Sequence, residues 1–333
     1  MIQLSIIIVN YKSAQLVCDC LQSITAQHSQ FNYEIIIVDN HSEDGSKEKI
    51  TGLFPEITWI QMGYNSGFAR ANNEGIRKSN GEIVLLLNSD TIIENNAIEN
   101  CYNHFVSSNY VACGVQLLNK DGSAQISGNY IMKGGLNYLL PLPFLGNILK
   151  AFAGLFGIKK PHVPDAATVE EVDWVNGAFL MVKRKAIHKA GLLDQDFFLY
   201  AEEAEWCSRL RKEGKLCIYG DIKVIHLQGE TSGEIFQSSD KGYKNLFDKK
   251  GLQIMLSNLL RIRKEFGVGW FIIILLFYVL EIPVFFIGTL LSQLFLSKKY
   301  SFLQVKNYSK NIFRIIRLSP TIISNQPYFY KVL

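Results

Sequence analysis

Two groups of residues in this 333-residue sequence have types and spacings that could do chemistry. The first group consists of polar residues at or just after the ends of apolar runs: Asn10, Asp39 and Asp90. The second group is a triplet of carboxylates within four positions: Glu202, Glu203 and Glu205. Carboxylates bind divalent cations and take protons from hydroxyl groups. The sequence therefore offers candidates for a metal site and for a general base.

The acidic triplet opens a helical pattern of apolar residues and has two interpretations. Acidic side chains in the first turn of a helix are stabilised by the helix dipole, so the triplet could be favourable capping charge. Against this, three carboxylates so close together repel one another, and a catalytic or cation-binding site would explain that cost. The residues alone leave both interpretations open.

The first group depends on the strands that carry it. Continuous apolar runs within residues 3–11, 34–40 and 82–87 are typical of strands buried on both faces, and residues 57–62 predict a shorter strand. Helical spacing of apolar residues between these runs predicts right-handed βαβ units. We therefore expect an α/β fold with a Rossmann-like, mostly parallel sheet flanked by helices.

Ligands of open α/β sheets bind at the carboxyl ends of the strands, so the three strand-end polar residues together predict a nucleotide site. For residues 88–90 the alternative is a cap of the following helix, which Thr91 and Glu94 would fit. The segment 65–75 contains Gly67, which would let the backbone approach a ligand closely, with Asn65, Arg70 and Asn72 as hydrogen-bond donors. Its alternative is an ordinary loop before an amphipathic helix.

These residues resemble a known family. The runs V-N-Y at 9–11, V-D-N at 38–40, N-S-G-F at 65–68 and N-S-D at 88–90 look like the nucleotide half of GT-A glycosyltransferases of family 2, and more narrowly of bacterial rhamnosyltransferase-like members that build O-antigen and related surface polysaccharides. The resemblance implies a divalent metal, Mg²⁺ or Mn²⁺, at Asp90. It also implies that Asp39 contacts the base of the nucleotide. It implies this nucleotide-sugar set: Val9, Asn10, Tyr11, Asp39, Asn65, Gly67, Phe68, Asn72, Asn88, Ser89 and Asp90.

The resemblance is sharpest at 197–210, which reads F-F-L-Y-A-E-E-A-E-W-C-S-R-L where the family has F-F-x-Y-x-E-D-x-D-x-C-x-R-L. It puts Glu203 at the position of the catalytic base. Both family aspartates are glutamates here, and G-x-F-D-E ahead of the motif has become G-L-L-D-Q at 191–195. It implies that these residues meet the donor or acceptor sugar: Trp174, Gly177, Glu202 and Glu205. His226, in the run H-L-Q-G-E-T-S at 226–232, is implied as a second metal ligand; as a lone histidine after a strand it could equally be structural.

The last quarter of the chain differs in composition from the rest. Residues 241–333 carry 14 basic and 3 acidic side chains, whereas residues 1–240 carry 20 and 27. The run 268–296 is apolar apart from Glu281 beside Pro283, and basic residues flank it on both sides. Charge at mid-depth is costly and positive flanks favour the cytoplasmic side. We therefore expect peripheral or re-entrant helices on the cytoplasmic leaflet of the plasma (inner) membrane, with a soluble helical subdomain or dimer interface as the alternative.

Several further expectations concern organisation. Residues 1–240 should form the GT-A domain, with a nucleotide half at 1–118 and an acceptor half at 119–240, and residues 241–333 the membrane-associating region. Residues 120–123 predict a hairpin turn, residues 172–182 a strand, residues 218–225 a last strand, and residues 131–164 a flexible loop that contacts acceptor or membrane. No signal-peptide pattern precedes the first strand, and six cysteines without a C-x-x-C pair should be reduced thiols.

The predicted function is transfer of a sugar, with rhamnose as one candidate, from a nucleotide-diphosphate donor to a hydroxyl of a lipid-linked glycan with inversion. One alternative is a catalytically impaired membrane-bound scaffold, which the two Asp-to-Glu changes motivate. Another is a sugar-1-phosphate nucleotidyltransferase, although the residues after the first strand lack the glycines that such an enzyme needs. A processive synthase would need several membrane spans and a Q-x-x-R-W motif, and no Arg-Trp pair occurs. The density of apolar residues between the basic ones in the tail favours lipid over nucleic acid.

Overall fold

A computed structural model describes residues 2–27, 30–132, 136–156, 161–163, 165–227, 236, 245–294 and 300–332. The chain divides into two compact units. The first comprises residues 1–132, 161–198 and 202–231, and the second comprises residues 133–160, 199–201 and 232–333.

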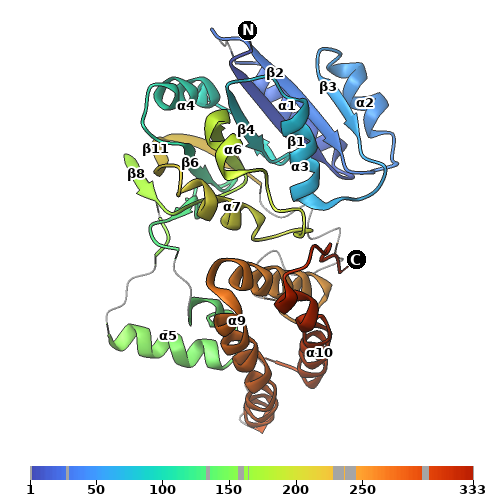
Figure 1. The fold of residues 1–333 in the computed structure, drawn as a ribbon, viewed down its shortest axis with the longest axis vertical. Helices are drawn as coiled ribbons and strands as arrows, with labels where there is room; N and C mark the ends of the chain where they lie inside the picture. Colours follow the sequence, from blue (N-terminus) through green and yellow to red (C-terminus); the bar gives the residue numbers. More distant parts are fainter. Residues whose placement is uncertain are drawn as a thin grey trace. The chain divides into compact units, whose positions relative to one another are not determined.

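The first unit is built on one large mixed sheet (Figure 1). Its strand order is β3-β2-β1-β4-β10-β6-β11-β5, with β8 paired to β11. The pairs β1–β2, β1–β4, β2–β3 and β6–β11 are parallel, whereas β10 runs antiparallel to both of its neighbours. The expected α/β fold with a parallel-rich sheet is confirmed.

The strand bounds follow the apolar runs closely. They are β1 (Leu4–Asn10), β2 (Tyr33–Asp39), β3 (Thr58–Gln61), β4 (Ile83–Leu87), β5 (Thr91–Ile92), β6 (Ala112–Leu118), β8 (Val169–Val172), β10 (Phe179–Lys183) and β11 (Leu216–His226). A separate ribbon pairs β7 (Gly128–Asn129) with β9 (Trp174–Val175). The helices of this unit are α1 (Ala14–Thr25), α2 (Ser46–Leu53), α3 (Gly67–Lys78), α4 (Ala97–Val106), α6 (Arg184–Ala190) and α7 (Glu202–Leu210).

Helices on both faces explain why the central strands read as continuous apolar runs. Alternate residues of β1, namely Leu4, Ile6 and Ile8, belong to one buried cluster with apolar residues of α1 and α4. Helix α3 contacts β1 and β2, and the side chain of Ile7 is fully buried although it lies outside that cluster. A strand covered on both sides buries every side chain, which removes the alternation of a half-exposed strand.

The structure differs from the sequence-based predictions in three short segments. Residues 172–182 do not form a single strand, because the chain turns at 176–178 between β9 and β10. Residues 88–90 do not cap a helix, since β5 follows them and α4 begins only after Asn96. The turn at 119–123 is present, with Gly122 at φ +82°, but it closes on a single bridge between Leu118 and Ala124.

The second unit is helical. The segment 131–164, expected to be a loop, contains a short 3₁₀ helix η1 (Leu136–Leu139) and α5 (Leu145–Leu155), while Gly134, Gly135 and Pro164 lie outside the described residues. Helix α9 (Lys249–Leu294) includes a non-helical backbone at Gly267 and contains Pro283. It packs along α10 (Phe302–Ser324), which begins with a capping box between Ser301 and Gln304 (Figure 1).

Glu281 has a structural partner inside this unit. Its two carboxylate oxygens accept hydrogen bonds from the backbone N–H groups of Phe144 and Leu145 over 2.7 and 3.0 Å. These N–H groups open α5 and have no partner within that helix, so the carboxylate caps it and is favoured by the helix dipole. The acid that interrupts the apolar run thereby fixes α5 to α9.

The long helix is the candidate membrane-associating element. Among the described residues, α9 is the helix with the length and composition needed to cross a membrane, and 28% of its most apolar window is buried inside the protein. All six cysteines are buried, and none forms a disulfide bond.

Candidate active site

Asp39 lies at the carboxyl end of β2, beside Asn10 at the end of β1. Its Oδ1 accepts hydrogen bonds from Asn10 Nδ2 (2.7 Å) and Ser42 Oγ (2.5 Å), and its Oδ2 accepts from the Ser42 N–H (3.0 Å) and Gln61 Nε2 (2.6 Å). A carboxylate has about four acceptor positions, so protein donors fill those of Asp39. The base of a bound nucleotide could reach the Asp39 carboxylate only by displacing one of these hydrogen-bond donors. Gln61 is the donor residue that is exposed to solvent.

A chain of hydroxyl contacts joins Asp39 to the segment of Asp90. Ser13 Oγ donates to Asn10 Oδ1 over 3.1 Å and lies 3.5 Å from Ser89 Oγ. Val9 and Tyr11, on either side of Asn10, are both partly exposed. The polar residues that end β1, β2 and β4 therefore share one edge of the sheet.

Asp90 and His226 are brought together by strand pairing. β5 begins directly after Asp90 and pairs with the end of β11, so that Thr91 stands opposite His226. The backbone N–H of Leu227 also donates to the carbonyl oxygen of Asp90 over 2.9 Å. As a result, Nε2 of His226 lies 3.3 Å from Oδ1 of Asp90, and both side chains are buried. Asn88 Nδ2 lies 3.3 Å from the same Nε2.

The donor atoms fit a divalent metal held jointly by protein and substrate. Among the described residues there is no cluster of three His, Cys, Asp or Glu side chains that could hold a metal by themselves. A carboxylate oxygen and an imidazole nitrogen nevertheless meet at one point. Mg²⁺ sites commonly use one or two carboxylates together with substrate phosphates and water. Gly229 and Ser232 of the run H-L-Q-G-E-T-S lie outside the described residues.

The segment 65–68 is held by protein rather than left open. The side chain of Asn40 accepts from the N–H and hydroxyl of Ser66, each over 2.7 Å, and donates to Asn65 Oδ1 over 3.1 Å. Gly67, at φ +74°, lies against the carbonyl oxygen of Phe198, to which an added Cβ would come within 2.2 Å. Its close approach is thus to backbone of the same unit, and the expected approach of a ligand to Gly67 stays a prediction.

Asn72 and Phe68 differ in accessibility. Asn72 is buried and donates to the carbonyl oxygen of Phe68 within α3 over 3.0 Å, so it stabilises the helix start. Phe68 is partly exposed. Arg70 donates to the carbonyl oxygen of Gln195 over 2.8 Å and to the Tyr64 hydroxyl over 3.2 Å, contacts that tie α3 to the loop after α6.

β10 brings the acceptor motif to the same edge as Asp90. Phe179 pairs with Leu87, and the Asn88 N–H donates to the carbonyl oxygen of Ala178 over 3.0 Å. The preceding Gly177 lies against Glu203, since an added Cβ would meet Cβ and Cγ of Glu203 at 3.4 Å. Asn88 therefore contacts Ala178, and the neighbouring Gly177 contacts Glu203 in the first turn of α7.

The two leading glutamates of α7 have different environments. Glu202 is buried, and its Oε2 has no hydrogen-bond partner among the described residues. Burial, and secondly the charge of Glu203, hold the pKa of Glu202 well above its usual range. Glu203 is partly exposed. The neutral form is thus favoured at Glu202, which leaves Glu203 as the accessible carboxylate of the pair.

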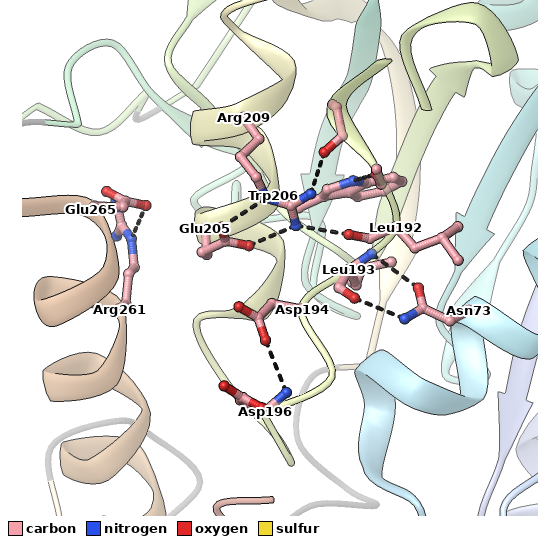
Figure 2. Close-up of polar contacts among 12 residues, drawn as sticks. Asn73, Leu192, Leu193, Asp194, Asp196, Glu205, Trp206, Arg209, Arg261 and Glu265 are labelled. Carbon is pink, nitrogen blue, oxygen red and sulfur yellow. Dashed lines mark hydrogen bonds and ion pairs between the residues drawn. The ribbon is translucent and has the colours of Figure 1, made fainter. Parts of the chain in front are cut away.

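Glu205 is engaged with Arg209 one turn later. Its two oxygens accept from Nε and Nη2 of Arg209, each over 2.8 Å, and the same guanidinium donates to the carbonyl oxygens of Ala190 and Leu192 (Figure 2). Figure 2 also shows Trp206 Nε1, which donates to the carbonyl oxygen of Gly191 over 2.8 Å. This arrangement favours a role for Glu205 in holding the loop 190–193 rather than in contacting a sugar.

The opposite side of that loop is held as firmly. Asn73 exchanges two hydrogen bonds with the backbone of Leu193, at 2.8 and 3.0 Å, and the Asp196 N–H donates to Asp194 Oδ1 over 2.9 Å (Figure 2). The altered motif G-L-L-D-Q therefore lies in the loop that joins α6 to α7. Hydrogen bonds from Asn73 of α3 and Arg209 of α7 hold this loop. The separate pair Arg261–Glu265 in Figure 2 belongs to α9, at 2.7 Å.

Trp174 lies on β9, opposite Asn129 in the two-stranded ribbon, and is partly buried. Its Nε1 is buried without a hydrogen-bond partner among the described residues. Helix α7 contacts β9, so Trp174 belongs to the same neighbourhood as Gly177.

Four positions that matter here were absent from the expected site. Asn40 anchors the segment 65–67, Gln61 bonds to Asp39, Gln125 bonds to His226, and Arg209 binds Glu205. Asn40 stood inside the V-D-N run and Arg209 inside the C-x-R-L run, so their place in those motifs was an available signal. Gln61 and Gln125 carried none, because isolated glutamines are common on any surface.

The parallel-rich sheet, with its polar edge and an acidic helix on the reversed strand, defines a fold of the GT-A type. The structure of GalNAc-T7 with UDP, GalNAc and Mn²⁺ shares this fold, with a TM-score of 0.50 and 14% identity over 68% of this chain and 43% of that one. At that identity the similarity concerns the fold alone. Residues 5–161, a little under half of the chain, match the model of the glycosyl transferase family 2, which confirms the resemblance over these residues.

Characterised relatives point in the same direction. The low-salt glycan biosynthesis hexosyltransferase Agl10 of Haloferax volcanii is 31% identical over 63% of this chain and 62% of its own length. The dTDP-rhamnosyl transferase RfbF of Shigella flexneri is 25% identical over 65% and 67%. The N-acetylglucosaminyl-diphospho-decaprenol L-rhamnosyltransferase of Mycobacterium tuberculosis is 23% identical over 60% and 68%. The match thus spans somewhat under two thirds of the length of Agl10, and about two thirds of the other two.

Proposed function

We propose that this protein transfers a sugar from a nucleotide-diphosphate donor to a hydroxyl group of a lipid-linked glycan, with inversion at the anomeric carbon. One observation carries the proposal. The reversed strand β10 lies beside β4, so that the Asp90 segment and the first turn of α7 stand at the same edge of the sheet, joined by the contacts Asn88–Ala178 and Gly177–Glu203. A donor and a hydroxyl bound there would meet.

The donor end would use the residues around Asp90. Asp90 and His226 would hold the divalent metal, either Mg²⁺ or Mn²⁺, by an oxygen and a nitrogen atom. When bound, the metal would offset the negative charge of the departing diphosphate. Asp39 would meet the base in exchange for its bond to Gln61, the exposed one of its four donors.

At the acceptor end, Glu203 would act as the general base. Its carboxylate would take the proton of the attacking hydroxyl, whose oxygen forms the new bond to the anomeric carbon while the bond to the diphosphate oxygen breaks on the opposite face. The contrast with Glu202 supports this assignment, because a buried neutral acid cannot accept a proton as a carboxylate does. A neutral Glu202 would instead keep a second negative charge away from Glu203.

The relatives suggest the substrate classes. The names of RfbF and of the mycobacterial enzyme specify rhamnosyl transfer, and the latter names a diphospho-decaprenol acceptor. We therefore propose rhamnose as the first donor sugar to test and a polyprenyl-diphosphate-linked saccharide as the acceptor, in the synthesis of a surface polysaccharide.

The helical unit would hold the protein on the cytoplasmic leaflet, where such acceptors are reached. Large apolar side chains of α5, α9 and α10 are exposed, among them Phe152, Trp270, Leu276, Phe286, Leu291 and Phe313. Basic residues on the same helices, such as Lys310, Arg314 and Arg317, would meet anionic headgroups. We expect the protein to float with anionic vesicles. We expect it not to float with purely zwitterionic vesicles in high salt. Equal flotation with both would leave the apolar surface as the sole source of binding.

The decisive experiment separates turnover from donor binding. Purified protein with Mn²⁺ is assayed with dTDP-rhamnose, and in parallel with UDP- and GDP-sugars, for release of the nucleoside diphosphate; binding is measured by calorimetry. Glu203→Gln should abolish turnover and leave the donor Kd within about two-fold, whereas Asp90→Asn should weaken donor binding in Mn²⁺. Retained turnover in Glu203→Gln would refute its role as base. A scaffold, the non-enzymatic alternative, would release no nucleotide from any donor even as the wild type.

A further inference from the structure

Gln125 lies directly behind the imidazole of His226. Its side-chain Oε1 is 2.9 Å from His226 Nδ1, and its Nε2 is 2.6 Å from the backbone carbonyl oxygen of His226. The side chain is buried, with 6% of its surface exposed, and so is that of His226. The Gln125 N–H also donates to the carbonyl oxygen of Leu117 over 2.8 Å, which fixes its backbone to β6.

The orientation of the Gln125 amide follows from its partners. A backbone carbonyl oxygen accepts hydrogen bonds and never donates them, so the NH₂ end of the amide must face the carbonyl of His226. A second acceptor, Asn119 Oδ1, lies 2.8 Å from the same Nε2. The Asn119 amide is in turn held by its Nδ2, which donates to Ser123 Oγ over 2.9 Å. With both hydrogens of the Gln125 NH₂ engaged, Oε1 is the atom that faces His226 Nδ1.

The proton of the imidazole is fixed as a consequence. Because Gln125 Oε1 only accepts, Nδ1 of His226 must carry the hydrogen, and in the neutral ring Nε2 then has the lone pair. That lone pair is directed to the point where Asp90 Oδ1 lies 3.3 Å away. Asn88 Nδ2, at 3.3 Å, can donate to it while no cation is present. Two electron-rich atoms facing one point are what a divalent cation requires.

We infer that Gln125 is a positioning residue, which holds His226 in the Nδ1–H tautomer and so keeps Nε2 available to a cation beside Asp90. A neutral amide suits this role, because it accepts one hydrogen bond from the ring and anchors the ring's own backbone with the other end. Partners that orient a ligating histidine in this way are worth about 10- to 100-fold in metal affinity. The metal part of the inference rests on the proposed function; the tautomer part stands on the hydrogen bonds alone.

The test compares Gln125→Met with Gln116→Met. Gln116 is a matched control because it is buried too, and its amide bonds to backbone atoms: Nε2 donates to the carbonyl oxygens of Leu117 (2.8 Å) and Gln125 (3.0 Å), and Oε1 accepts from the Ala166 N–H (2.8 Å). It therefore contacts the backbone of Gln125 but, among the described residues, makes no hydrogen bond to the Gln125 side-chain amide or to His226. Nitrogen NMR of the full-length protein with ¹⁵N-labelled histidine reports the tautomer, with the His226 signals assigned by their loss in His226→Ala. Electron paramagnetic resonance of Mn²⁺ in the absence of nucleotide gives the metal Kd.

The expected result is an Nδ1–H tautomer in the wild type and in Gln116→Met, and a shift towards Nε2–H in Gln125→Met with a Mn²⁺ Kd raised about 10- to 100-fold. An unchanged tautomer in Gln125→Met overturns the inference. If the tautomer shifts in Gln125→Met but neither Gln125→Met nor His226→Ala changes the Mn²⁺ Kd, the positioning role of Gln125 stands. The same result would overturn the proposed metal site. Should Gln125→Met fail to fold, Asn119→Ala removes one anchor of the amide, and we expect a partial shift towards the Nε2–H tautomer with a rise in Mn²⁺ Kd smaller than the roughly 10- to 100-fold rise for loss of the whole partner; an unchanged tautomer would count against the inference.

Discussion

The backbone N–H of Phe68 donates a hydrogen bond to the carbonyl oxygen of Phe198 over 2.8 Å. This bond joins the start of α3, in the nucleotide half of the sequence, to the F-F-x-Y run that leads to the acidic helix. The contact is possible because Gly67 has no side chain, as an added Cβ would stand 2.2 Å from the same carbonyl oxygen. The two motifs are therefore packed directly against each other.

Gly67→Ala should be among the most damaging single substitutions in the first unit. The methyl group would meet both a left-handed backbone, φ +74°, and the backbone of Phe198. A left-handed alanine costs about 1–2 kcal/mol and overpacking about 1–3 kcal/mol, so we expect a loss of about 2–5 kcal/mol in urea unfolding, together with loss of turnover. Gly122→Ala isolates the first effect, since Gly122 has φ +82° but open space around it. Equal losses in both variants would show that the contact with Phe198 is unimportant.

Glu205→Gln tests whether this carboxylate holds the loop 190–193. The substitution would leave the half-buried guanidinium of Arg209 without its counter-charge, at an expected cost of about 2–3 kcal/mol after allowance for its partial exposure. Glu74→Gln removes the partly exposed partner of the exposed Arg77 and should cost less than about 0.5 kcal/mol. Unfolding in urea gives both values. If Glu205 contacts a sugar instead, its substitution should raise KM without a comparable loss of stability.

Glu202→Gln should change how stability depends on pH. Because the pKa of Glu202 is raised in the folded state above its ordinary value of 4.5, the folded protein retains a proton that the unfolded chain releases. This group therefore lowers the free energy of unfolding as pH rises from about 4.5 through the folded-state pKa, and its contribution is most favourable below that window. Glutamine has no such proton to lose. We expect Glu202→Gln to melt at a higher temperature than the wild type at pH 8, with the difference shrinking towards pH 5; a difference constant with pH would contradict the shift.

Glu203→Asp restores the residue that the family resemblance has at this position, yet it should impair the enzyme. The Glu203 side chain packs against Gly177, which has no Cβ and so leaves room next to Cβ and Cγ of Glu203. Shortening the side chain withdraws the carboxylate by roughly one bond length, and a displacement on that scale costs about 10²-fold in rate. Single-turnover kinetics with saturating donor should show the loss in kcat with donor Kd unchanged. A rate equal to that of the wild type would mean that the site tolerates either length.

The sequence was most informative where structure is local. Continuous apolar runs located β1, β2 and β4 within one or two residues, because a strand covered on both faces buries every side chain it has. The polar residues at their ends were then placed at one edge by the geometry of parallel strands. The acidic first turn of α7 was equally readable, since acids before a helical apolar pattern are a local signal.

Features that depend on distant partners were not readable. The composition of residues 172–182 predicts one strand, because the turn at Gly177 interrupts an otherwise uniform β-like run; the structure has β9 and the reversed strand β10 there. The sequence predicts a loop where α5 forms, since the carboxylate that caps this helix comes from Glu281 in another helix. The ion pair of Glu205 with Arg209 has no signal in the sequence, because Arg209 looks like any surface arginine until the loop 190–193 is folded against it.

The two-residue ladder between β5 and β11 has a practical consequence for anyone dissecting the protein. A fragment comprising residues 1–132 would contain every motif of the nucleotide half, yet it would lack β10, which separates β4 from β6, and β11, which covers β6. Such a fragment would leave one edge of β4, both edges of β6 and the paired edge of β5 without hydrogen-bond partners, and it would keep Asp90 while losing the imidazole beside it. The proposed cation site would thus be complete only after synthesis has passed residue 226, so Mn²⁺ binding would report complete folding.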